Sequence, residues 1–178
     1  MKKNLLLNSV HDLIRCNTSS VDVLVDATLG NGYDTLFLST IAKHVYAFDI
    51  QEKAIQASKK RLTGITNVSF IHDSHEKILE YVSNFKGIVF NLGYLPGSDK
   101  SITTLADTTI KTLEQLLPKL PIGGFVSITV YIGHDQGKLE SAAVEAYLEN
   151  LNSNYEILKS TIFNKRSAPY HLFIKKNN

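Results

Sequence analysis

The chain has 178 residues, of which 43% are hydrophobic and 20% are charged, and it contains 19 lysines and arginines against 17 aspartates and glutamates. This composition predicts one globular domain over residues 1–178 and excludes a disordered or fibrous chain. The formal net charge of +2 argues against a protein that holds nucleic acid mainly by electrostatics. Any nucleic-acid partner is therefore expected to be recognised at a local site.

Two features of the sequence bear on its compartment. Cys16 is the single cysteine, so an internal disulfide is impossible and nothing indicates an oxidising environment. Polar residues interrupt the apolar start at Leu5–Leu7 too early for a signal peptide, and no apolar run reaches the roughly 18 to 20 residues of a membrane span. We therefore predict a cytoplasmic protein with no membrane contact.

After an amphipathic N-terminal helix within residues 1–16, apolar runs of strand length alternate with segments of helical period. Strands are expected at Val21–Ala27, His44–Ile50, Val68–His72, Gly87–Leu92 and Phe125–Ile132, and helices at Asp34–Ala42, Glu52–Leu62, His75–Val82, Thr104–Leu117 and Lys138–Leu151. Strands that are apolar on both faces indicate a mostly parallel sheet covered by helices on each side. The pattern predicts an α/β, Rossmann-like, doubly wound sheet.

The C-terminal part breaks this rhythm. Two further strands are expected at Tyr155–Phe163 and Tyr170–Ile174, and the connector Asn164–Pro169 is too short for a parallel crossover. We predict that residues 155–175 form an antiparallel hairpin at one edge of a seven-stranded sheet.

Open α/β sheets bind ligands beyond the carboxyl ends of their strands, and the first strand ends in a glycine turn. Gly30 and Gly32 let the backbone turn tightly and approach a ligand closely. The third glycine of a dinucleotide fingerprint would stand at position 35, which is Thr35, so a pyrophosphate cofactor is disfavoured. The alternative is a plain βα turn.

Acidic and polar residues follow the next two strands. Asp49 is suited to accept the hydroxyl hydrogens of a ribose, with Ile50 offering an apolar face to a base, or else it caps the following helix. The glycine turn nearby favours the ribose interpretation. After the third strand, Ser74 either caps a helix or hydrogen-bonds the edge of an adenine.

The fourth strand carries the strongest signal. It ends in Asn91 and continues into a loop of turn-forming and polar residues, Gly93–Ser101, which suits recognition of an amine and of a flat substrate, the alternative being a rigid surface loop. His134, after the fifth strand, is either a proton acceptor, a phosphate contact or a solvated loop residue. His11 lies on a helix that either covers the sheet edge or closes the cofactor pocket. No Cys/His cluster has metal-ligand spacing, so we predict no metal.

Five segments together resemble one family of class I, S-adenosylmethionine-dependent methyltransferases. They are Asp26–Leu38, Ala47–Gln51, Ser74–Glu76, Asn91–Thr104 and Tyr131–His134. The family is small and single-domain and has long been labelled "putative rRNA methylase". Its characterised members are bacterial tRNA methyltransferases that convert 5-aminomethyl-(2-thio)uridine at the wobble position to the 5-methylaminomethyl form. An rRNA methyltransferase or a small-molecule methyltransferase is the alternative.

The resemblance implies a cofactor, a substrate and a set of site residues. S-adenosylmethionine would be bound by Asp26, Thr28, Gly30, Asn31, Gly32, Asp34, Asp49, Ile50, Gln51, Ser74, His75, Asn91 and Gly93. Asn91 would orient the amine, Tyr94 would stack on the flipped base, and Asp99 or His134 would take the proton. The RNA contacts would be Tyr94, Lys100, Ser101, His134, Lys165 and Arg166. The expected partner is tRNA, at its anticodon loop, bound by a monomer or a homodimer.

The chain departs from the family in the C-terminal hairpin. Family members tend to have an Asn-Gln-x-Asn-x-Pro-Pro-like segment, where this chain has Asn164–Tyr170 with the basic pair Lys165 and Arg166. That pair is suited to RNA phosphates.

Overall fold

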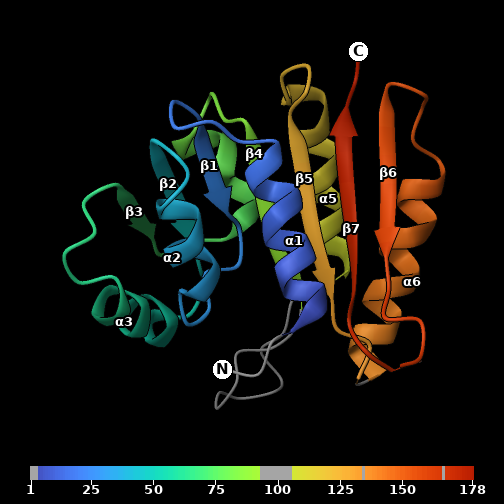
Figure 1. Cartoon of the computed structure of the whole chain (residues 1–178), viewed down its shortest axis with the longest axis horizontal. Helices are drawn as coiled ribbons and strands as arrows, with labels where there is room; N and C mark the ends of the chain where they lie inside the picture. Colours follow the sequence, from blue (N-terminus) through green and yellow to red (C-terminus); the bar gives the residue numbers. More distant parts are fainter. Residues whose placement is uncertain (1–3, 93–105, 134, 166) are drawn as a thin grey trace.

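The computed structural model describes residues 4–92, 106–133, 135–165 and 167–178, with the backbone alone at 135–136. Its centre is a seven-stranded sheet with the strand order β3-β2-β1-β4-β5-β7-β6 (Figure 1). The strands are β1 (Val23–Asp26), β2 (His44–Phe48), β3 (Val68–Ile71), β4 (Gly87–Leu92), β5 (Phe125–Val130), β6 (Tyr155–Ser160) and β7 (Tyr170–Lys176). Strands β1 to β5 run parallel, and β7 pairs antiparallel with both β5 and β6. The predicted sheet and its C-terminal antiparallel hairpin are confirmed.

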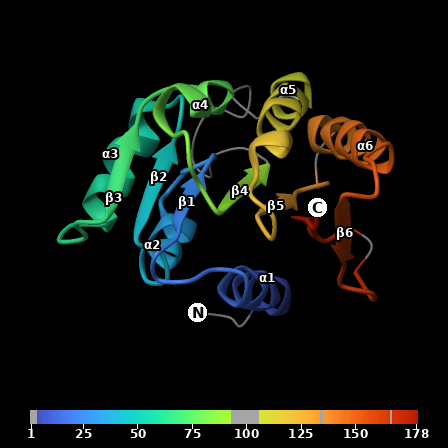
Figure 2. The same ribbon diagram turned by 90° about the horizontal axis from the view of Figure 1, so that it is seen from above.

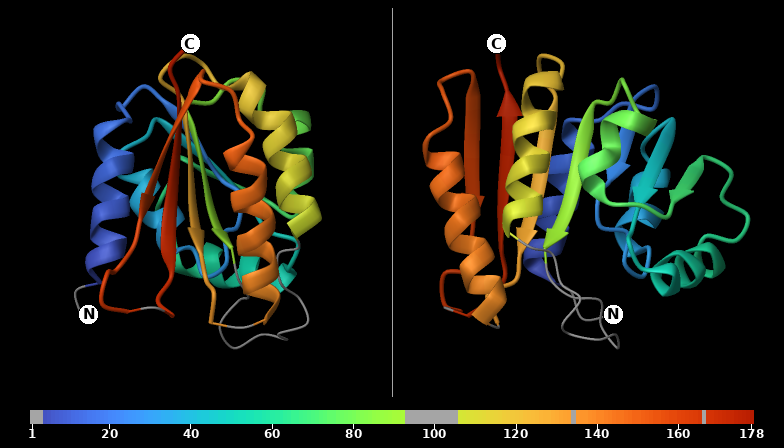
Figure 3. Two further views of the ribbon diagram at one scale, coloured as in Figure 1. Left: turned by 90° about the vertical axis from the view of Figure 1, so that its right-hand side faces the viewer. Right: turned by 180° about the vertical axis from the view of Figure 1, so that it is seen from behind.

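Helices cover both faces of the sheet. They are α1 (Leu5–Cys16), α2 (Tyr33–Ser39), α3 (Glu52–Arg61), α4 (Ile78–Tyr81), α5 (Ala106–Leu116) and α6 (Asp135–Glu149), with the 3₁₀ turns η1 (His75–Lys77) and η2 (Leu117–Lys119). Figures 2 and 3 show α1 and α2 on one face and α4, α5 and α6 on the other. The alternation of side chains along each strand explains this, since neighbouring residues such as Leu24 and Val25 belong to opposite cores.

Helix α1 packs on the middle of one sheet face. Its buried side chains Leu6, Val10 and Ile14 belong to the same core as Phe125 and Phe173 of the central strands. The helix therefore does not cover a sheet edge, which was one of the two alternatives for this segment.

The element boundaries differ from the expected ones mainly at the ends. The first strand is shorter than Val21–Ala27, and Val21 is exposed. The expected helix His75–Val82 is divided into η1 and α4 because Ser74 caps a single 3₁₀ turn first. The strands were expected to be buried on both faces. This expectation is wrong for β3, which is half-buried throughout. This strand has a neighbour on one side only, since it ends the sheet.

The first and last described residues lie at opposite ends of the strands (Figure 1). The carboxyl ends of β1, β2, β4 and β5 lie where α1 begins, and this side of the sheet is called its carboxyl edge below. The C-terminus lies at the opposite ends of the strands. Within the described ranges, no helix combines the length and the apolar character that crossing a membrane would take.

Gly87 provides a test of this packing, because its register partner across β4 and β5 is the fully buried Phe125. A Cβ atom at Gly87 would lie 2.3 to 2.6 Å from three atoms of the Phe125 ring. We expect Gly87→Ala to lower the free energy of unfolding by about 2 kcal/mol or more, because the ring has no free space to enter. Gly133→Ala is the matched control, since a Cβ there meets nothing within 4 Å. Urea denaturation of both variants checks this, and equal stabilities would contradict the packing.

Candidate functional site

The glycine turn after β1 is held from outside by α3. Gly30 and Gly32 have φ angles of +52° and +76°, which residues other than glycine rarely adopt. A Cβ atom at Gly32 would lie 2.8 Å from Ser58 Oγ and from Leu62 Cδ1. The Ser58 hydroxyl also donates to the Gly30 carbonyl over 2.9 Å. The backbone of α2 therefore begins pressed against α3, with its first N–H groups at the carboxyl edge of the sheet.

Asp26, the last residue of β1, is almost fully buried. Its carboxylate accepts hydrogen bonds from the Thr28 backbone N–H at 3.1 Å and from the Thr35 hydroxyl. Burial raises the pKa of the Asp26 carboxyl from 3.8 to about 7, and the charge of Asp34 adds to this shift. Thr35 replaces the third glycine of a dinucleotide turn, and its hydroxyl supplies a donor that the buried carboxyl needs.

Asp49 connects the end of β2 to the glycine turn. Its carboxylate oxygens accept from the backbone N–H groups of Gly30 and Gln51, each at 2.9 Å. The N-cap of α3 is Gln51, without a side-chain cap bond, so the alternative interpretation of Asp49 as the helix cap is wrong. Burial raises its pKa, and the carboxylate keeps acceptor capacity for a further donor. Ile50 is 58% exposed beside it.

The residues after β3 have other partners. Ser74 Oγ accepts from the Glu76 backbone N–H at 3.2 Å, so it acts as a cap. The His75 imidazole contacts the Phe90 ring edge-on, and its Nδ1 lies 2.8 Å from Thr112 Oγ1. Because the Thr112 hydroxyl donates to the Thr108 carbonyl, His75 Nδ1–H is the donor. Burial lowers the His75 pKa, so this side chain is a neutral core residue. A contact of Ser74 or His75 with a cofactor stays a prediction.

Asn91, near the end of β4, is fixed by two donors of its own. Its backbone N–H donates to Thr28 Oγ1 at 2.6 Å, and its Nδ2 donates to Asp34 Oδ2 at 2.7 Å. A carboxylate only accepts, so the amide nitrogen must face Asp34 and the orientation of the amide is determined. The other amide atom, Asn91 Oδ1, is buried and has no hydrogen-bond partner among the residues that the structure describes. A buried acceptor without a donor is costly, and it indicates a place where a ligand supplies one.

Two further side chains contact the pair formed by Asp34 and Asn91. His11 of α1 has its Nε2 3.3 Å from Asp34 Oδ1 and stacks on Phe37 with ring centroids 3.8 Å apart. Tyr131, the first residue after β5, accepts a hydrogen bond from the Asn91 side chain, and burial together with the Asp34 charge raises its pKa. Helix α1 thus contributes directly to the site. Tyr131 was not predicted as a site residue, although its place directly after a central strand was a usable signal.

The structure brings together the predicted Asp26, Thr28, Gly30, Gly32, Asp34, Asp49 and Asn91. Asn31 uses its carbonyl to accept from Arg61 Nε at 2.7 Å, and the Arg61 guanidinium covers the Tyr33 ring at 3.6 Å. Lys165 lies away from this group, exposed in the β6–β7 connector. The other predicted site residues, Gly93, Tyr94, Asp99, Lys100, Ser101, His134 and Arg166, lie outside the described residues.

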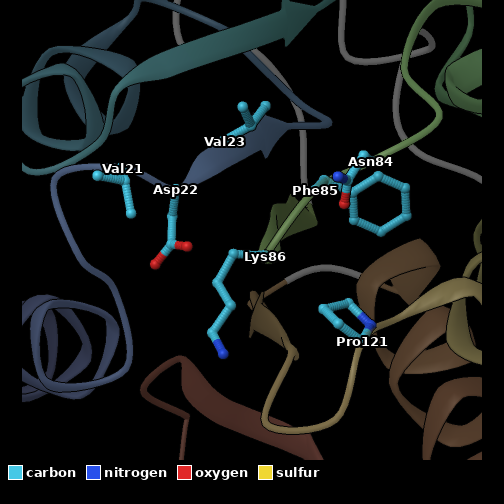
Figure 4. Close-up of a pocket in the computed structure, with 7 residues that line it drawn as sticks. All are labelled: Val21, Asp22, Val23, Asn84, Phe85, Lys86 and Pro121. Atoms are coloured by element: carbon cyan, nitrogen blue, oxygen red, sulfur yellow. The ribbon is translucent and has the colours of Figure 1, made fainter.

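A pocket of about 310 Å³ lies at the opposite edge, where β1 and β4 begin (Figure 4). Its acidic residue, Asp22, already accepts from the backbone N–H and the hydroxyl of Ser19, at 2.7 and 2.9 Å. Candidate chemistry is therefore gathered at the carboxyl edge. The described parts of the chain contain no group of three or more His, Cys, Asp or Glu side chains arranged to hold a metal ion.

The raised pKa of Asp26 predicts how stability depends on pH. The Asp26 carboxyl ionises near pH 4 in the unfolded chain and near pH 7 in the folded protein. The free energy of unfolding of the wild type therefore decreases as the pH rises between these two values. Asp26→Asn removes this titration. The free energy of unfolding of Asp26→Asn minus that of the wild type should increase by a few kcal/mol between the unfolded and the folded pKa of Asp26, and it should stay level at higher pH.

Urea denaturation of both proteins at several pH values from about 5 to about 8 measures this difference. Asp12→Asn, at an exposed position on α1, is the control and should show no such trend. A constant difference between Asp26→Asn and wild type would show that Asp26 ionises normally in the folded protein.

Comparison with known proteins identifies the family. Residues 45–176 match the model of a family described as "Putative rRNA methylase". A chloroplastic tRNA (mnm(5)s(2)U34)-methyltransferase of Arabidopsis thaliana is 37% identical over 173 residues, which cover 87% of this chain. The matched part is 63% of the Arabidopsis protein, so the chain spans less than two thirds of that relative's length.

Solved structures agree with this match. A crystal structure described as a "putative rRNA-methylase" from Clostridium thermocellum is 34% identical, with a TM-score of 0.92 and coverage of 99% of this chain and 100% of that one. SMU.1697c of Streptococcus mutans, described as a "putative methyltransferase" and crystallised in complex with SAH, is 35% identical, with a TM-score of 0.90 and 99% coverage of both chains. The predicted methyltransferase fold is confirmed, and with a family match that extends over most of its length, the chain belongs to the family described as "Putative rRNA methylase".

Proposed function

We propose that this protein methylates the primary amine of 5-aminomethyl-(2-thio)uridine at the wobble position of tRNA, using S-adenosylmethionine, and so forms the 5-methylaminomethyl nucleoside. The observation that carries the proposal is the buried, unpartnered Asn91 Oδ1 near the end of β4, which a ligand that donates a hydrogen bond would satisfy. An amine is such a ligand. The Arabidopsis relative, named as a tRNA (mnm(5)s(2)U34)-methyltransferase, supports the choice of substrate.

The carboxyl edge of the sheet fits S-adenosylmethionine. Asp49 has acceptor capacity left for ribose hydroxyls beside the exposed face of Ile50. The glycine turn would present its backbone to the ligand, and Asp34 would place negative charge near the cationic sulfonium and amino groups, joined by Asp26 whenever that carboxyl is ionised. The similar SMU.1697c structure, 35% identical to this chain, is in complex with SAH, which is what remains of this cofactor after methyl transfer. When bound, the cofactor supplies the methyl group and the sulfide leaving group of an in-line displacement.

Asn91 would orient the amine so that its lone pair stays free. Oδ1 accepts an N–H hydrogen and leaves the nitrogen lone pair pointing elsewhere, toward the methyl group. Asp34 keeps the amide from turning, because Nδ2 is held at 2.7 Å by a group that only accepts. His11 holds the other oxygen of Asp34 at 3.3 Å. The chain thus supplies orientation, which alone accounts for a large part of the rate of such displacements.

The methylated amine must then lose a proton. The raised pKa of Tyr131 keeps its phenol protonated at neutral pH, so Tyr131 is not the base. Asp99 and His134 stay our candidates for this role, and Tyr94 our candidate for stacking on the target base. All three lie outside the described residues. A cytoplasmic location and a monomeric or dimeric state also stay predictions.

The function is tested by incubating tRNA that carries 5-aminomethyl-(2-thio)uridine with the protein and isotopically labelled S-adenosylmethionine. Nucleoside mass spectrometry should find the label in 5-methylaminomethyl-(2-thio)uridine and in no other nucleoside. The control is the same tRNA without the aminomethyl group, which should stay unlabelled because it lacks the nucleophile. Label in rRNA instead, or in no RNA at all, would overturn the assignment to tRNA.

Substitution of Asn91 separates binding from catalysis. Asn91→Ala should reduce methyl transfer about 100-fold or more, while calorimetry shows unchanged affinity for S-adenosylmethionine. Asp49→Ala should do the reverse and lose cofactor affinity first. His11→Ala should cause a smaller loss of turnover, and His44→Ala, whose imidazole pairs with Ser69 Oγ at the opposite edge of the sheet, none. Wild-type turnover by Asn91→Ala would refute the orienting role.

A further inference from the structure

A second pocket lies at the carboxyl edge, between α6 and the hairpin connector. It has a volume of about 330 Å³, and its lining includes Ile132, Ser141, Glu145, Lys159, Phe163 and Lys165. The connector belongs to this edge because Tyr170 pairs with Val130 at the end of β5, and His171 pairs with Ser160 at the end of β6. The pocket therefore opens on the same edge of the sheet as Asn91.

The connector is a formed turn that presents an aromatic ring to solvent. The Lys165 N–H donates to the Ile162 carbonyl at 3.0 Å, and the Ala168 N–H donates to the Lys165 carbonyl at 3.1 Å. Between them Phe163 is fully exposed. A phenylalanine ring held entirely in water is unfavourable in the free protein, and a ring on a formed turn offers a flat face to a partner.

The charges around the pocket leave one unmatched cation. Glu145 is matched by Lys159, whose Nζ lies 2.8 Å from Glu145 Oε1 and 4.6 Å from the centroid of the Tyr170 ring. Lys165 is exposed and makes no ion pair with any residue of the described ranges. An aromatic face beside a free lysine is the combination that binds single-stranded nucleic acid, through base stacking and phosphate contact.

We propose that Phe163 and Lys165, named here the hairpin platform, bind the nucleotide next to the target uridine. Phe163 stacks on the neighbouring base, and Lys165 contacts a phosphate. This inference rests on the proposed function, because it takes RNA as the substrate and the Asn91 site as the place of the target base.

The two sites lie along the same carboxyl edge of the sheet, within reach of neighbouring nucleotides of one RNA strand. Tyr131 belongs to the Asn91 site, and the next residue, Ile132, lines the pocket. Strands β5 and β7 separate β4, which carries Asn91, from β6, which leads into Phe163, so three strand spacings of about 5 Å each lie between them.

The platform is tested by the affinity for a fluorescent anticodon stem–loop RNA, measured by anisotropy. Phe163→Ala and Phe163→Leu should both weaken binding about 10-fold, since leucine keeps the apolar surface but has no face for stacking. Phe163→Trp should retain wild-type affinity. Lys165→Ala should weaken binding and reduce the slope of log affinity against log salt concentration by about 0.7 to 0.9. Ile122→Ala and Lys119→Ala, exposed positions before β5 at the opposite edge, are the matched controls.

The outcomes separate the two proposals. If wild type methylates and binds the RNA but Phe163→Ala binds equally well, the platform is refuted while the proposed function stands. If Phe163→Leu binds as well as wild type, stacking on the Phe163 ring is refuted. If wild type neither binds nor methylates tRNA, the proposed function itself fails. Unchanged affinity of every variant for S-adenosylmethionine confirms that they are folded.

Discussion

Three aspartates at the carboxyl edge of the sheet need hydrogen-bond donors, and the site is built by the elements that supply them. Asp26 takes its donors from the loop after β1 and from α2, and Asp49 takes them from the glycine turn and the start of α3. Asp34 takes them from α1 and β4. Carboxylates placed together out of water are stable only with such partners. The positions of the loops after β1 and β2 and of the Asn91 amide follow from this requirement.

The three carboxylates divide the edge into a cofactor side and a substrate side. Asp49 and the glycine turn lie toward β2, where a nucleoside fits. Asp34 belongs to both sides, because it stands in the first turn of α2 yet orients an amide on β4. The low net charge of +2 is consistent with this division. Specific donors and acceptors, rather than a broad basic surface, would select the substrate, with few phosphate contacts added.

Much of the fold could be predicted from the sequence because its signals are local. Apolar runs such as Gly87–Leu92 gave the strands, and the short connector at Asn164–Pro169 gave the antiparallel hairpin. The cofactor side could also be predicted, since a glycine turn and an acidic strand end occupy fixed places in this architecture. The split of the expected helix at His75 was missed because it depends on a capping bond by Ser74. The hydrogen bond of Thr35 with Asp26 and the contact of His11 with Asp34 were also missed. The residues next to Thr35 and His11 in the chain do not indicate which carboxylate each one contacts.

The packing of α1 on the sheet has a consequence for the fraction of molecules in which the site is fully formed. Its apolar face is held by one core with the central strands, whereas its link to the site is a single contact of His11 with Asp34. Local opening of this helix would release His11 and leave Asp34 free to turn with the Asn91 amide. The site is therefore complete only while an element from the very start of the described chain stays closed over the sheet. The docking equilibrium of that helix sets an upper limit on the fraction of molecules that are competent at any moment.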